Sequence, residues 1–232
     1  MANILCLDFD DTIVLDNTLR QLLGRFGTVS DEEHAALVDE PRRRGELTVE
    51  QGNIRSLECI DAEVSDADLA AYVIEVARPR AGLQELCDWA LWNEWLVVCV
   101  SLGFDIYVNP VLDSLGLDRV ARHVGRTSRA YKRQLRYDSP RGIQVESGFK
   151  VSYARAFKDA GDYVVYFGDG ESDIDAARLA PVVFARSTLL ERLAGEREGV
   201  YPFETFDDAI TVLDKEAEGW LRSFSSTTAA AG

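Results

Sequence analysis

A continuous apolar run that ends in a dense group of acidic residues constrains this chain more than any other feature. Residues 3–14 have the sequence NILCLDFDDTIV, so Asp8, Asp10 and Asp11 follow directly on the apolar run. An apolar run without polar alternation is typical of a parallel strand that is covered on both faces. Ligands of open parallel sheets bind beyond the carboxyl ends of the strands. The pattern therefore predicts a buried strand whose acidic end borders a functional site.

The remaining sequence predicts alternating strands and helices, with one helical insertion. Residues 17–78 contain four stretches with helical spacing and no strand-like run, and Ser or Thr capping residues precede three of the four. After residue 80, the strand-like runs 94–101, 162–169 and 181–185 alternate with helical ones. This alternation is typical of a parallel sheet with helices on both faces.

These patterns together predict an α/β fold with two domains. The core is expected to be a doubly wound, Rossmann-like parallel sheet, and the insertion a small helical-bundle cap. The low-complexity end of the chain is expected to be flexible. The expected boundaries are 1–16 and 79–224 for the core, 17–78 for the cap, and 225–232 for the flexible tail.

Composition restricts the class of partner. The formal net charge is -15, and such an acidic surface repels nucleic acids and anionic membranes. No apolar run is long enough to span a bilayer, and the first residues lack the basic region of a signal peptide. The four cysteines form no C-x-x-C pair, so reduced thiols are expected. We therefore expect a cytoplasmic protein that binds a small molecule, and the sequence leaves its oligomeric state open.

Polar side chains end each of the three strongest strand candidates. The first run ends at Asp8, the second at Ser101, and the third in GDGESD, which contains Asp169 and Asp173. Carboxylates that lie close together repel one another, and a hard divalent cation removes that repulsion. Ligands that are all oxygen atoms favour Mg²⁺. One carboxylate could then attack a phosphoryl group as a nucleophile.

Four motifs, in the order DFDDT, VSLGFD, SGFK and GDGESD, resemble those of the haloacid dehalogenase superfamily of phosphatases. One D-x-D-x-T motif has low specificity, whereas four in order from Asp8 to Asp173 are specific. The insertion resembles the helical cap of the subgroup that contains phosphoserine phosphatase, and such a cap excludes water and contacts the leaving group. The segments LDNTL, GDGESDIDAA and VFARSTLLERL…YPFETFDD are similar to a methionine-salvage phosphatase family that acts on a hydroxy-keto-methylthiopentenyl phosphate.

The resemblance implies a role for each matching position. Asp8 would attack phosphorus and form an aspartyl-phosphate, and Asp10 would act as general acid and then general base. Lys150 would neutralise charge on the nucleophile and on the transferring group. Asp8, the backbone carbonyl of Asp10 and Asp169 would bind Mg²⁺. Asp173 would support either the metal site or Lys150.

The resemblance also implies a binding site for the phosphate and the substrate. Ser101 and the backbone amides after it, at Leu102 and Gly103, would bind phosphoryl oxygens, and Thr12 would fix the loop after the nucleophile. Related families usually carry glycine where this chain has Leu102, so a side chain is expected beside the phosphate loop. Asn17 stands where phosphoserine phosphatases carry a glutamate that binds the substrate amine. Phosphoserine is therefore disfavoured as substrate, and the substrate stays open.

The resulting prediction is a magnesium-dependent phosphatase that hydrolyses a small phosphomonoester through an aspartyl-phosphate. One alternative is a phosphotransferase, in which an acceptor alcohol replaces water. Another is a binding or regulatory protein without turnover, and Leu102 is the only reason to keep it. A signalling receiver domain would also combine acidic residues, Ser or Thr, and lysine. The insertion and the second acidic pair, Asp169 and Asp173, argue against that class.

Two basic segments remain outside the motifs. Residues 119–136 carry seven arginines and lysines, and we interpret them as a solvated flap or hairpin, of which one or two arginines could contact an anionic leaving group. Pro41 is expected to end a helix, which makes PRRRG, residues 41–45, a loop of the cap. If that loop faces the core, one of its arginines could bind a carboxylate or a second phosphate.

Overall fold

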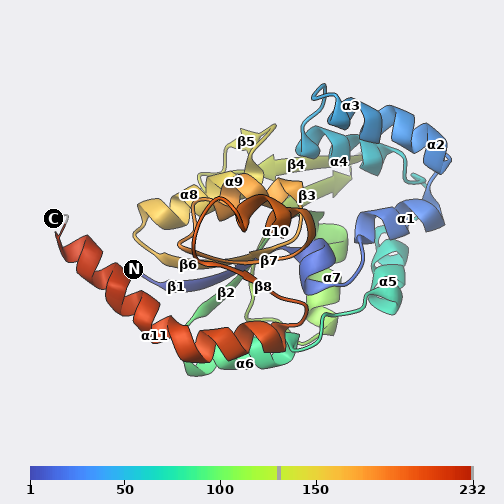
Figure 1. Ribbon diagram of the computed structural model, residues 1–232. Coiled ribbons are helices and arrows are strands. Elements are labelled where there is room, and N and C mark those ends of the chain that lie inside the picture. The colour runs from blue at the N-terminus through green and yellow to red at the C-terminus, as the bar shows by residue number, and fades with distance from the viewer. Residues whose placement is uncertain (130–131, 231–232) are drawn as a thin grey trace.

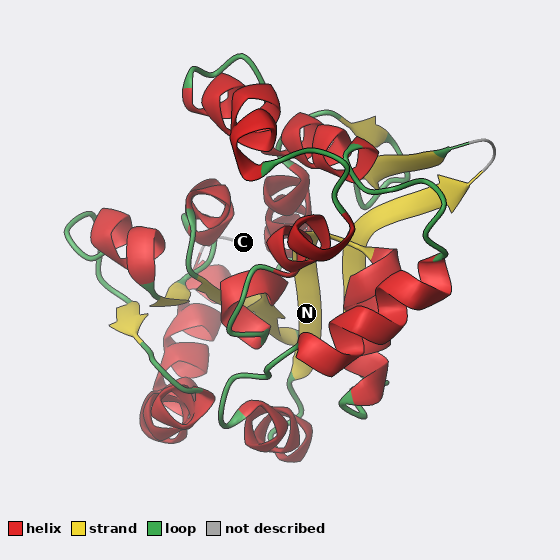
Figure 2. Ribbon diagram, turned by 90° about the vertical axis from the view of Figure 1, so that its right-hand side faces the viewer, coloured by secondary structure: helices red, strands yellow, loops and turns green. Residues whose placement is uncertain are grey.

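A mostly parallel sheet with helices on both faces forms the centre of the molecule (Figures 1 and 2). The computed structural model describes residues 1–129 and 132–230. Within these residues the sheet has eight strands in the order β5-β4-β3-β2-β1-β6-β7-β8. The strands are β1 (Asn3–Leu7), β2 (Leu96–Phe104), β3 (Ala121–Arg129), β4 (Arg133–Asp138), β5 (Gln144–Val145), β6 (Tyr163–Gly168), β7 (Val182–Ala185) and β8 (Val200–Pro202).

Six of these strands pair in parallel, and only β4 and β5 at one edge are antiparallel. Helices α8, α9 and α10 lie over one face of the sheet, and α6 and α11 lie over the other (Figure 1). This arrangement confirms the predicted doubly wound α/β fold. The helices of this part are α6 (Leu83–Trp92), α7 (Asp105–Ser114), α8 (Phe149–Asp159), α9 (Ile174–Ala177), α10 (Ser187–Leu193) and α11 (Phe206–Ala230).

Strand β1 lies at the centre of the sheet, which explains its uninterrupted apolar sequence. Leu7 at its end is paired with Cys99 of β2 on one side and with Phe167 of β6 on the other. Helices cover both faces, so Leu5 and Leu7 have no exposed surface. The strand order changes direction at β1, and a crevice beyond the carboxyl ends of the strands forms at such a point.

Between β1 and α6 the chain forms only helices, which we call the insert (residues 17–78). The predicted caps are present: Ser30, Thr48 and Ser65 accept hydrogen bonds from the backbone of α2, α4 and α5. The insert is at the upper right of Figure 1. Its action as a separate cap domain stays a prediction. Its helices are α1 (Thr18–Phe26), α2 (Asp31–His34), α3 (Glu40–Arg43), α4 (Val49–Glu58) and α5 (Asp66–Val76).

The expectation that Pro41 ends a helix was wrong. Helix α2 continues through a π-helical turn, Ala35–Asp39, into α3, and Pro41 lies in the first turn of α3. The π-helical turn accommodates the proline, and the carbonyl of Leu37, four residues before Pro41, accepts a hydrogen bond from the Arg55 guanidinium at 3.3 Å in place of the missing N–H. Arg42 and Arg43 are therefore on a helix, and only the end of the PRRRG segment is a turn.

The basic run forms a hairpin, β3 and β4, which attaches to the insert. Arg133 is buried, and its guanidinium donates to the Asp66 carboxylate at 2.8 Å and to the Asp61 carbonyl at 3.0 Å. On the surface Lys132 pairs with Glu58 at 3.1 Å. The hairpin is thus as predicted, but it is not wholly solvated. Residues 130 and 131 of the run lie outside the described residues.

The C-terminal helix α11 packs beside α6 (Figure 1). Its backbone is helical as far as Ala230, through most of the segment expected to be a flexible tail. The flexibility of that segment stays a prediction, and residues 231–232 are outside the description. Among the described helices, none combines the length and the apolar character that crossing a bilayer requires.

Candidate active site

One cavity of about 320 Å³ is lined by most of the residues that the sequence motifs singled out, with Thr12 and Asp173 as the exceptions. Asp8 directly follows β1 and Asp169 directly follows β6. Ser101 lies in β2, two residues beyond Cys99, where the pairing of β2 with β1 stops. Lys150 lies in the first turn of α8. The sequence expectation that these groups meet at the carboxyl edge of the sheet therefore agrees with the geometry.

Lys150 connects two buried carboxylates. Its ammonium nitrogen is 2.9 Å from Asp8 Oδ1 and 2.7 Å from Asp173 Oδ1, and it also donates to the Ser172 hydroxyl at 3.2 Å. Burial alone would lower the pKa of Lys150, but the charges of Asp173 and Asp8 outweigh burial and raise it. Burial raises the pKa of Asp8 well above its usual range, and Lys150 opposes that shift. Lys150 thus stays protonated beside the carboxylate of Asp8.

Asp173 has no exposed surface, and its carboxylate is saturated with hydrogen bonds. Besides the lysine, Oδ1 accepts from the Tyr166 hydroxyl at 2.7 Å, and Oδ2 accepts from the backbone N–H groups of Asp169 and Gly170 at 3.3 and 3.1 Å. A Cβ at Gly168 would be 2.7 Å from Asp173 Cγ, so glycine is needed for this close approach. Asp173 therefore holds Lys150 and the loop after β6 in place.

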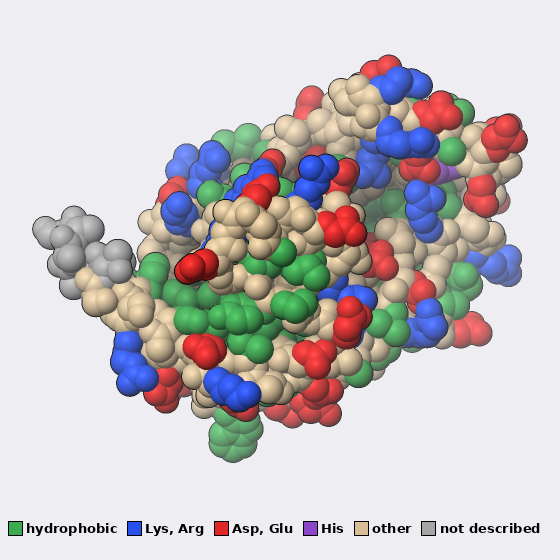
Figure 3. Space-filling view, in the orientation of Figure 1, with side chains coloured by type: hydrophobic (Ala, Val, Ile, Leu, Met, Phe, Trp, Pro, Cys, Tyr) green, Lys and Arg blue, Asp and Glu red, His purple; other side chains and the backbone are tan. Residues whose placement is uncertain are grey.

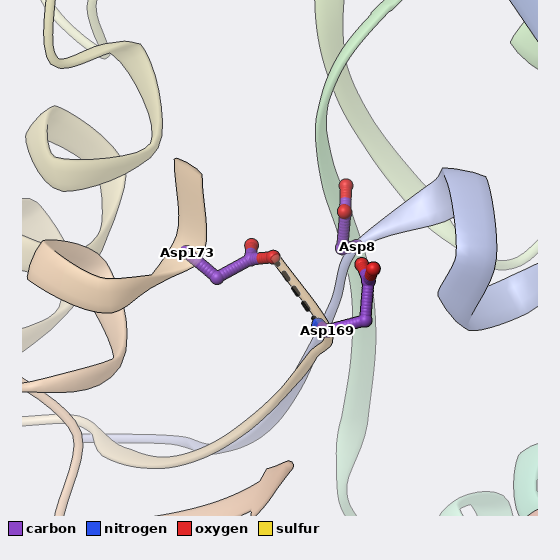
Figure 4. Close-up of side chains that lie close together, drawn as sticks. All are labelled: Asp8, Asp169 and Asp173. Carbon is purple, nitrogen blue, oxygen red and sulfur yellow. Dashed lines mark hydrogen bonds between the residues drawn. The ribbon is translucent and has the colours of Figure 1, made fainter. Parts of the chain in front are cut away.

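Asp8, Asp169 and Asp173 could together hold a metal ion. Each offers an oxygen, and the three oxygens lie within 4.8 Å of one another. In Figure 4, the carboxylates of Asp8 and Asp169 project from the ends of neighbouring strands, whereas that of Asp173 points to the backbone of Asp169. Burial, and then the charge of Asp173, raises the pKa of Asp169 to about 7. A cation would relieve this repulsion, and a donor set of carboxylate oxygens suits a hard divalent cation.

Asp10 lines the cavity two residues after Asp8. Its Oδ1 accepts from the backbone N–H of Thr18 at 2.7 Å, and the Tyr107 hydroxyl donates to its Oδ2 at 3.4 Å. Burial raises the pKa of Asp10 to about 6, although the hydrogen bond from Thr18 opposes the shift. The first residue of α1 thereby positions the second acid of the DFDDT motif.

The loop after Asp8 is fixed by Arg80, which does not line the cavity. Buried Arg80 donates to the carbonyl of Thr12 at 2.7 Å and to that of Asp11 at 2.6 Å. Thr12 itself has no exposed surface and does not line the cavity. The structure therefore does not bring Thr12 to the substrate space, and Asp173, which is also fully buried, contacts Lys150 rather than lining the cavity.

Ser101, Leu102 and Gly103 line the cavity together. The N–H of Gly103 donates to the Ser101 hydroxyl at 3.0 Å. The Leu102 carbonyl accepts from the Tyr137 hydroxyl at 2.6 Å and from the Asn53 amide at 3.0 Å. Leu102 is 8% exposed and lines the cavity next to Ser101. The role of this segment as a phosphate loop stays a prediction.

Asn17 both caps α1 and lines the cavity. Its side-chain oxygen accepts from the backbone N–H of Arg20 at 3.0 Å. Sequence reasoning missed Tyr107, Asn53 and Glu171, which also line the cavity. Tyr107 and Asn53 resemble ordinary helix residues in the sequence, and only the packing of distant segments brings them to the site.

The basic hairpin does not contribute to this cavity. No residue of its described part lines the cavity, whereas Arg42 of α3 does. The alternative interpretation, in which an arginine of residues 119–136 contacts a leaving group, is therefore unsupported. The lining residues are Asp8, Asp10, Asp11, Asn17, Leu19, Arg42, Val49, Asn53, Ser101, Leu102, Gly103, Tyr107, Lys150, Asp169, Gly170, Glu171 and Ser172.

This doubly wound sheet, with a lysine and paired aspartates at its switch point, defines an α/β enzyme with an acidic site. The chain belongs to the haloacid dehalogenase-like hydrolases, because the model of that family matches residues 5–178. Among the curated relatives, a 2-hydroxy-3-keto-5-methylthiopentenyl-1-phosphate phosphatase of Bacillus cereus is 26% identical over 205 residues, which cover 87% of this chain and 91% of that protein.

A second relative is the bifunctional enzyme MtnB/MtnX of Bacillus licheniformis, which is 28% identical over 218 residues. The match covers 93% of this chain, and the chain spans about half the length of that relative, 50%. Among solved structures, a phospho-aspartyl intermediate analogue of phosphoserine phosphatase has a TM-score of 0.67 at 21% identity. The aligned region covers 90% of this chain and 98% of the phosphoserine phosphatase chain, which shows that the two share a fold. The names of the relatives confirm the prediction of a phosphatase of this family.

Proposed function

We propose that this enzyme hydrolyses a small-molecule phosphomonoester in a magnesium-dependent reaction, through an aspartyl-phosphate at Asp8. The observation that carries the proposal is the pairing of Asp8 with Lys150 at 2.9 Å in a cavity that Asp10 and Asp169 also line. One oxygen of Asp8 is held by the lysine, which leaves the other available to attack. The lysine also offsets negative charge as a phosphoryl group approaches.

Atoms and charges balance over two steps. Asp8 forms a bond to phosphorus as the ester P–O bond breaks, and Asp10 gives a proton to the departing alkoxide. Water then attacks the phosphorus of the aspartyl-phosphate and gives its proton to Asp10. Inorganic phosphate leaves, and the carboxylate of Asp8 is restored. The Thr18 backbone N–H holds Asp10 in reach of both steps.

In this proposal Asp8, Asp169 and the backbone carbonyl of Asp10 would hold Mg²⁺, which is supported by carboxylate oxygens of Asp8 and Asp169 within 4.8 Å of one another. When bound, the ion neutralises charge on the phosphoryl group and on the two carboxylates. Asp173 serves as a support in this proposal, because its oxygens are already used by Lys150, Tyr166 and the backbone. Ser101 and the amides after it bind the phosphoryl oxygens.

Phosphate release from a panel of phosphorylated metabolites tests the function. The panel includes 2-hydroxy-3-keto-5-methylthiopentenyl-1-phosphate, the compound in the name of the relatives, and phosphoserine. We expect magnesium-dependent release from at least one ester, and loss of release in Asp8→Asn with the fold intact by circular dichroism. Substantial turnover by Asp8→Asn would remove Asp8 from the nucleophile role. Product analysis with added alcohols separates hydrolysis from transfer.

A further inference from the structure

The two basic residues that line the cavity differ in their pairing with acidic residues. Five acidic residues line it, and the basic lining residues are Lys150 and Arg42. Lys150 is already bound between Asp8 and Asp173, at 2.9 and 2.7 Å. Among the described residues, no hydrogen bond or ion pair is formed by the guanidinium of Arg42. Arg42 is thus the basic group of the cavity wall whose charge is available to a ligand.

The acids near Arg42 in sequence are bound to other arginines. Asp39, one helical turn earlier, accepts a hydrogen bond from Arg20 at 3.1 Å. Glu46 pairs with Arg44 at 2.7 Å. Glu171 lines the same cavity and forms no ion pair with Arg42 in the described chain. The neighbourhood therefore does not neutralise the half-buried guanidinium.

Helix α4 provides the space for the side chain of Arg42. A Cβ at Gly52 would lie 2.5 Å from Arg42 Cδ and 3.2 Å from Arg42 Cγ. Gly52 is buried in the interior of α4, where glycine costs about 0.5–1 kcal/mol relative to alanine. The missing side chain lets the apolar stem of Arg42 pack against α4. Glycine at position 52 therefore lowers the stability of α4 but leaves room for the side chain of Arg42.

Arg42 also borders a second cavity, of about 390 Å³, which adjoins the first. Arg42, Val49 and Glu171 line both cavities, and the second adds Arg20, Arg43, Asp39 and Leu47. Figure 3 shows Lys and Arg side chains, with some Asp and Glu side chains among them, around the hollow at the upper right. Three arginines and two acids, Asp39 and Glu171, therefore line the second cavity, and Asp39 is already paired with Arg20. This excess of arginine contrasts with the formal net charge of -15 of the whole chain.

We propose that the leaving group of the substrate carries a second anionic group, a carboxylate or a phosphate, and that Arg42 binds it. This inference rests on the proposed function. A guanidinium matches both anions through paired N–H groups. It would also offset the repulsion that an acidic protein exerts on a doubly anionic ester. A neutral leaving group would leave the guanidinium without a partner.

Matched alkyl phosphates of increasing chain length test the proposal on the full-length enzyme with Mg²⁺. Each length is made with a terminal carboxylate, a terminal phosphate and a neutral carboxamide. We expect kcat/KM for the best anionic ester to exceed that for its carboxamide by about 10- to 100-fold, the range of a charge-assisted hydrogen bond. The terminus that gives the larger ratio identifies the anion. A wild-type ratio near one overturns the proposal.

Variants assign the preference to Arg42. Arg42→Gln should reduce the ratio to near one, and Arg42→Lys should keep part of it. Gly52→Ala, which displaces the stem but keeps the charge, should also lower the ratio. Arg44→Gln is the matched control: it removes the same charge from the end of α3, at a residue that lines neither cavity, and should keep the ratio. An unchanged ratio in both Arg42→Gln and Gly52→Ala would refute the assignment.

The ratio separates this inference from the proposed function. General losses of activity cancel because both esters are compared in the same variant. Asp8-dependent hydrolysis of p-nitrophenyl phosphate without anionic preference would leave the proposed function in place and overturn this inference alone. If neither the anionic esters, nor the carboxamide esters, nor p-nitrophenyl phosphate release phosphate, the proposed function and this inference are both refuted.

Discussion

At the scale of single residues, Lys150 joins the two buried carboxylates of the site. It lies between Asp8 and Asp173. All three side chains are buried: Lys150 is 2% exposed, Asp8 is 8% exposed and Asp173 is 0% exposed. Two carboxylates so close together would repel each other strongly without it. The motif SGFK indicates this lysine in the sequence, but the sequence does not indicate that Tyr166 and the backbone complete the network around Asp173.

Replacement of Lys150 by Met should therefore destabilise the fold as well as the site. We expect Lys150→Met to lower the free energy of unfolding by about 3–5 kcal/mol without Mg²⁺, the usual cost of removing one partner of a buried ion pair. Urea denaturation measures this. The control is Lys158→Met on the same helix, where the lysine is exposed and should change stability by less than about 0.5 kcal/mol. Equal stability of the two variants would contradict the buried-pair account.

At the scale of elements, features that depend on neighbouring residues were predictable from the sequence, whereas contacts between distant segments were not. The apolar runs at β1, β2 and β6 and the caps Ser30 and Thr48 depend on neighbouring residues, so they were predictable. The continuation of the helix through Pro41 was not, because it depends on the π-helical turn before the proline and on a hydrogen bond from Arg55 of the next helix. The positions of Asn53 and Tyr107 depend on packing between segments far apart in the chain, for which one sequence contains no pattern.

Helix α4 of the insert is coupled to α8 by Glu50. This buried side chain accepts a hydrogen bond from the backbone N–H of Phe149 at 2.8 Å, directly before Lys150. Glu50→Ala should leave that N–H unsatisfied and cost about 1–3 kcal/mol of stability, with a loss of phosphatase activity as Lys150 shifts. Glu50→Gln, which keeps an acceptor oxygen, should recover most of both. Calorimetry and phosphate release measure the two effects.

The control for α4 is Glu58→Ala at the other end of the helix. Glu58 forms an exposed pair with Lys132 at 3.1 Å, and exposed pairs contribute little. A similar loss of activity in Glu58→Ala and Glu50→Ala would indicate a general effect of α4 rather than the bond to Phe149.

At the scale of the whole molecule, the acidic net charge of the chain and the acidic residues of the site both favour binding of a cation. The formal net charge is -15, and burial adds to the cost of keeping Asp8 and Asp169 charged next to each other. The sequence predicted both the acidic surface and the acidic edge of the sheet from composition and motifs. It could not predict which acids are already satisfied, because that depends on the hydrogen bonds of Asp173 and on the pairing of arginines with the insert.

Binding of Mg²⁺ should therefore stabilise the native protein more than screening by salt does. A ligand at 100 times its dissociation constant adds about 2.7 kcal/mol, which is about 5–10 °C in Tm for a chain of this size. Asp169→Asn should lose most of that shift, yet be at least as stable as the wild type without metal, because the amide does not repel Asp8 and Asp173. Asp175→Asn, an exposed acid paired with Arg178, should keep the shift. Scanning calorimetry in MgCl₂ and in NaCl of equal ionic strength tests this, and an equal MgCl₂ shift in Asp169→Asn and the wild type would place the ion elsewhere.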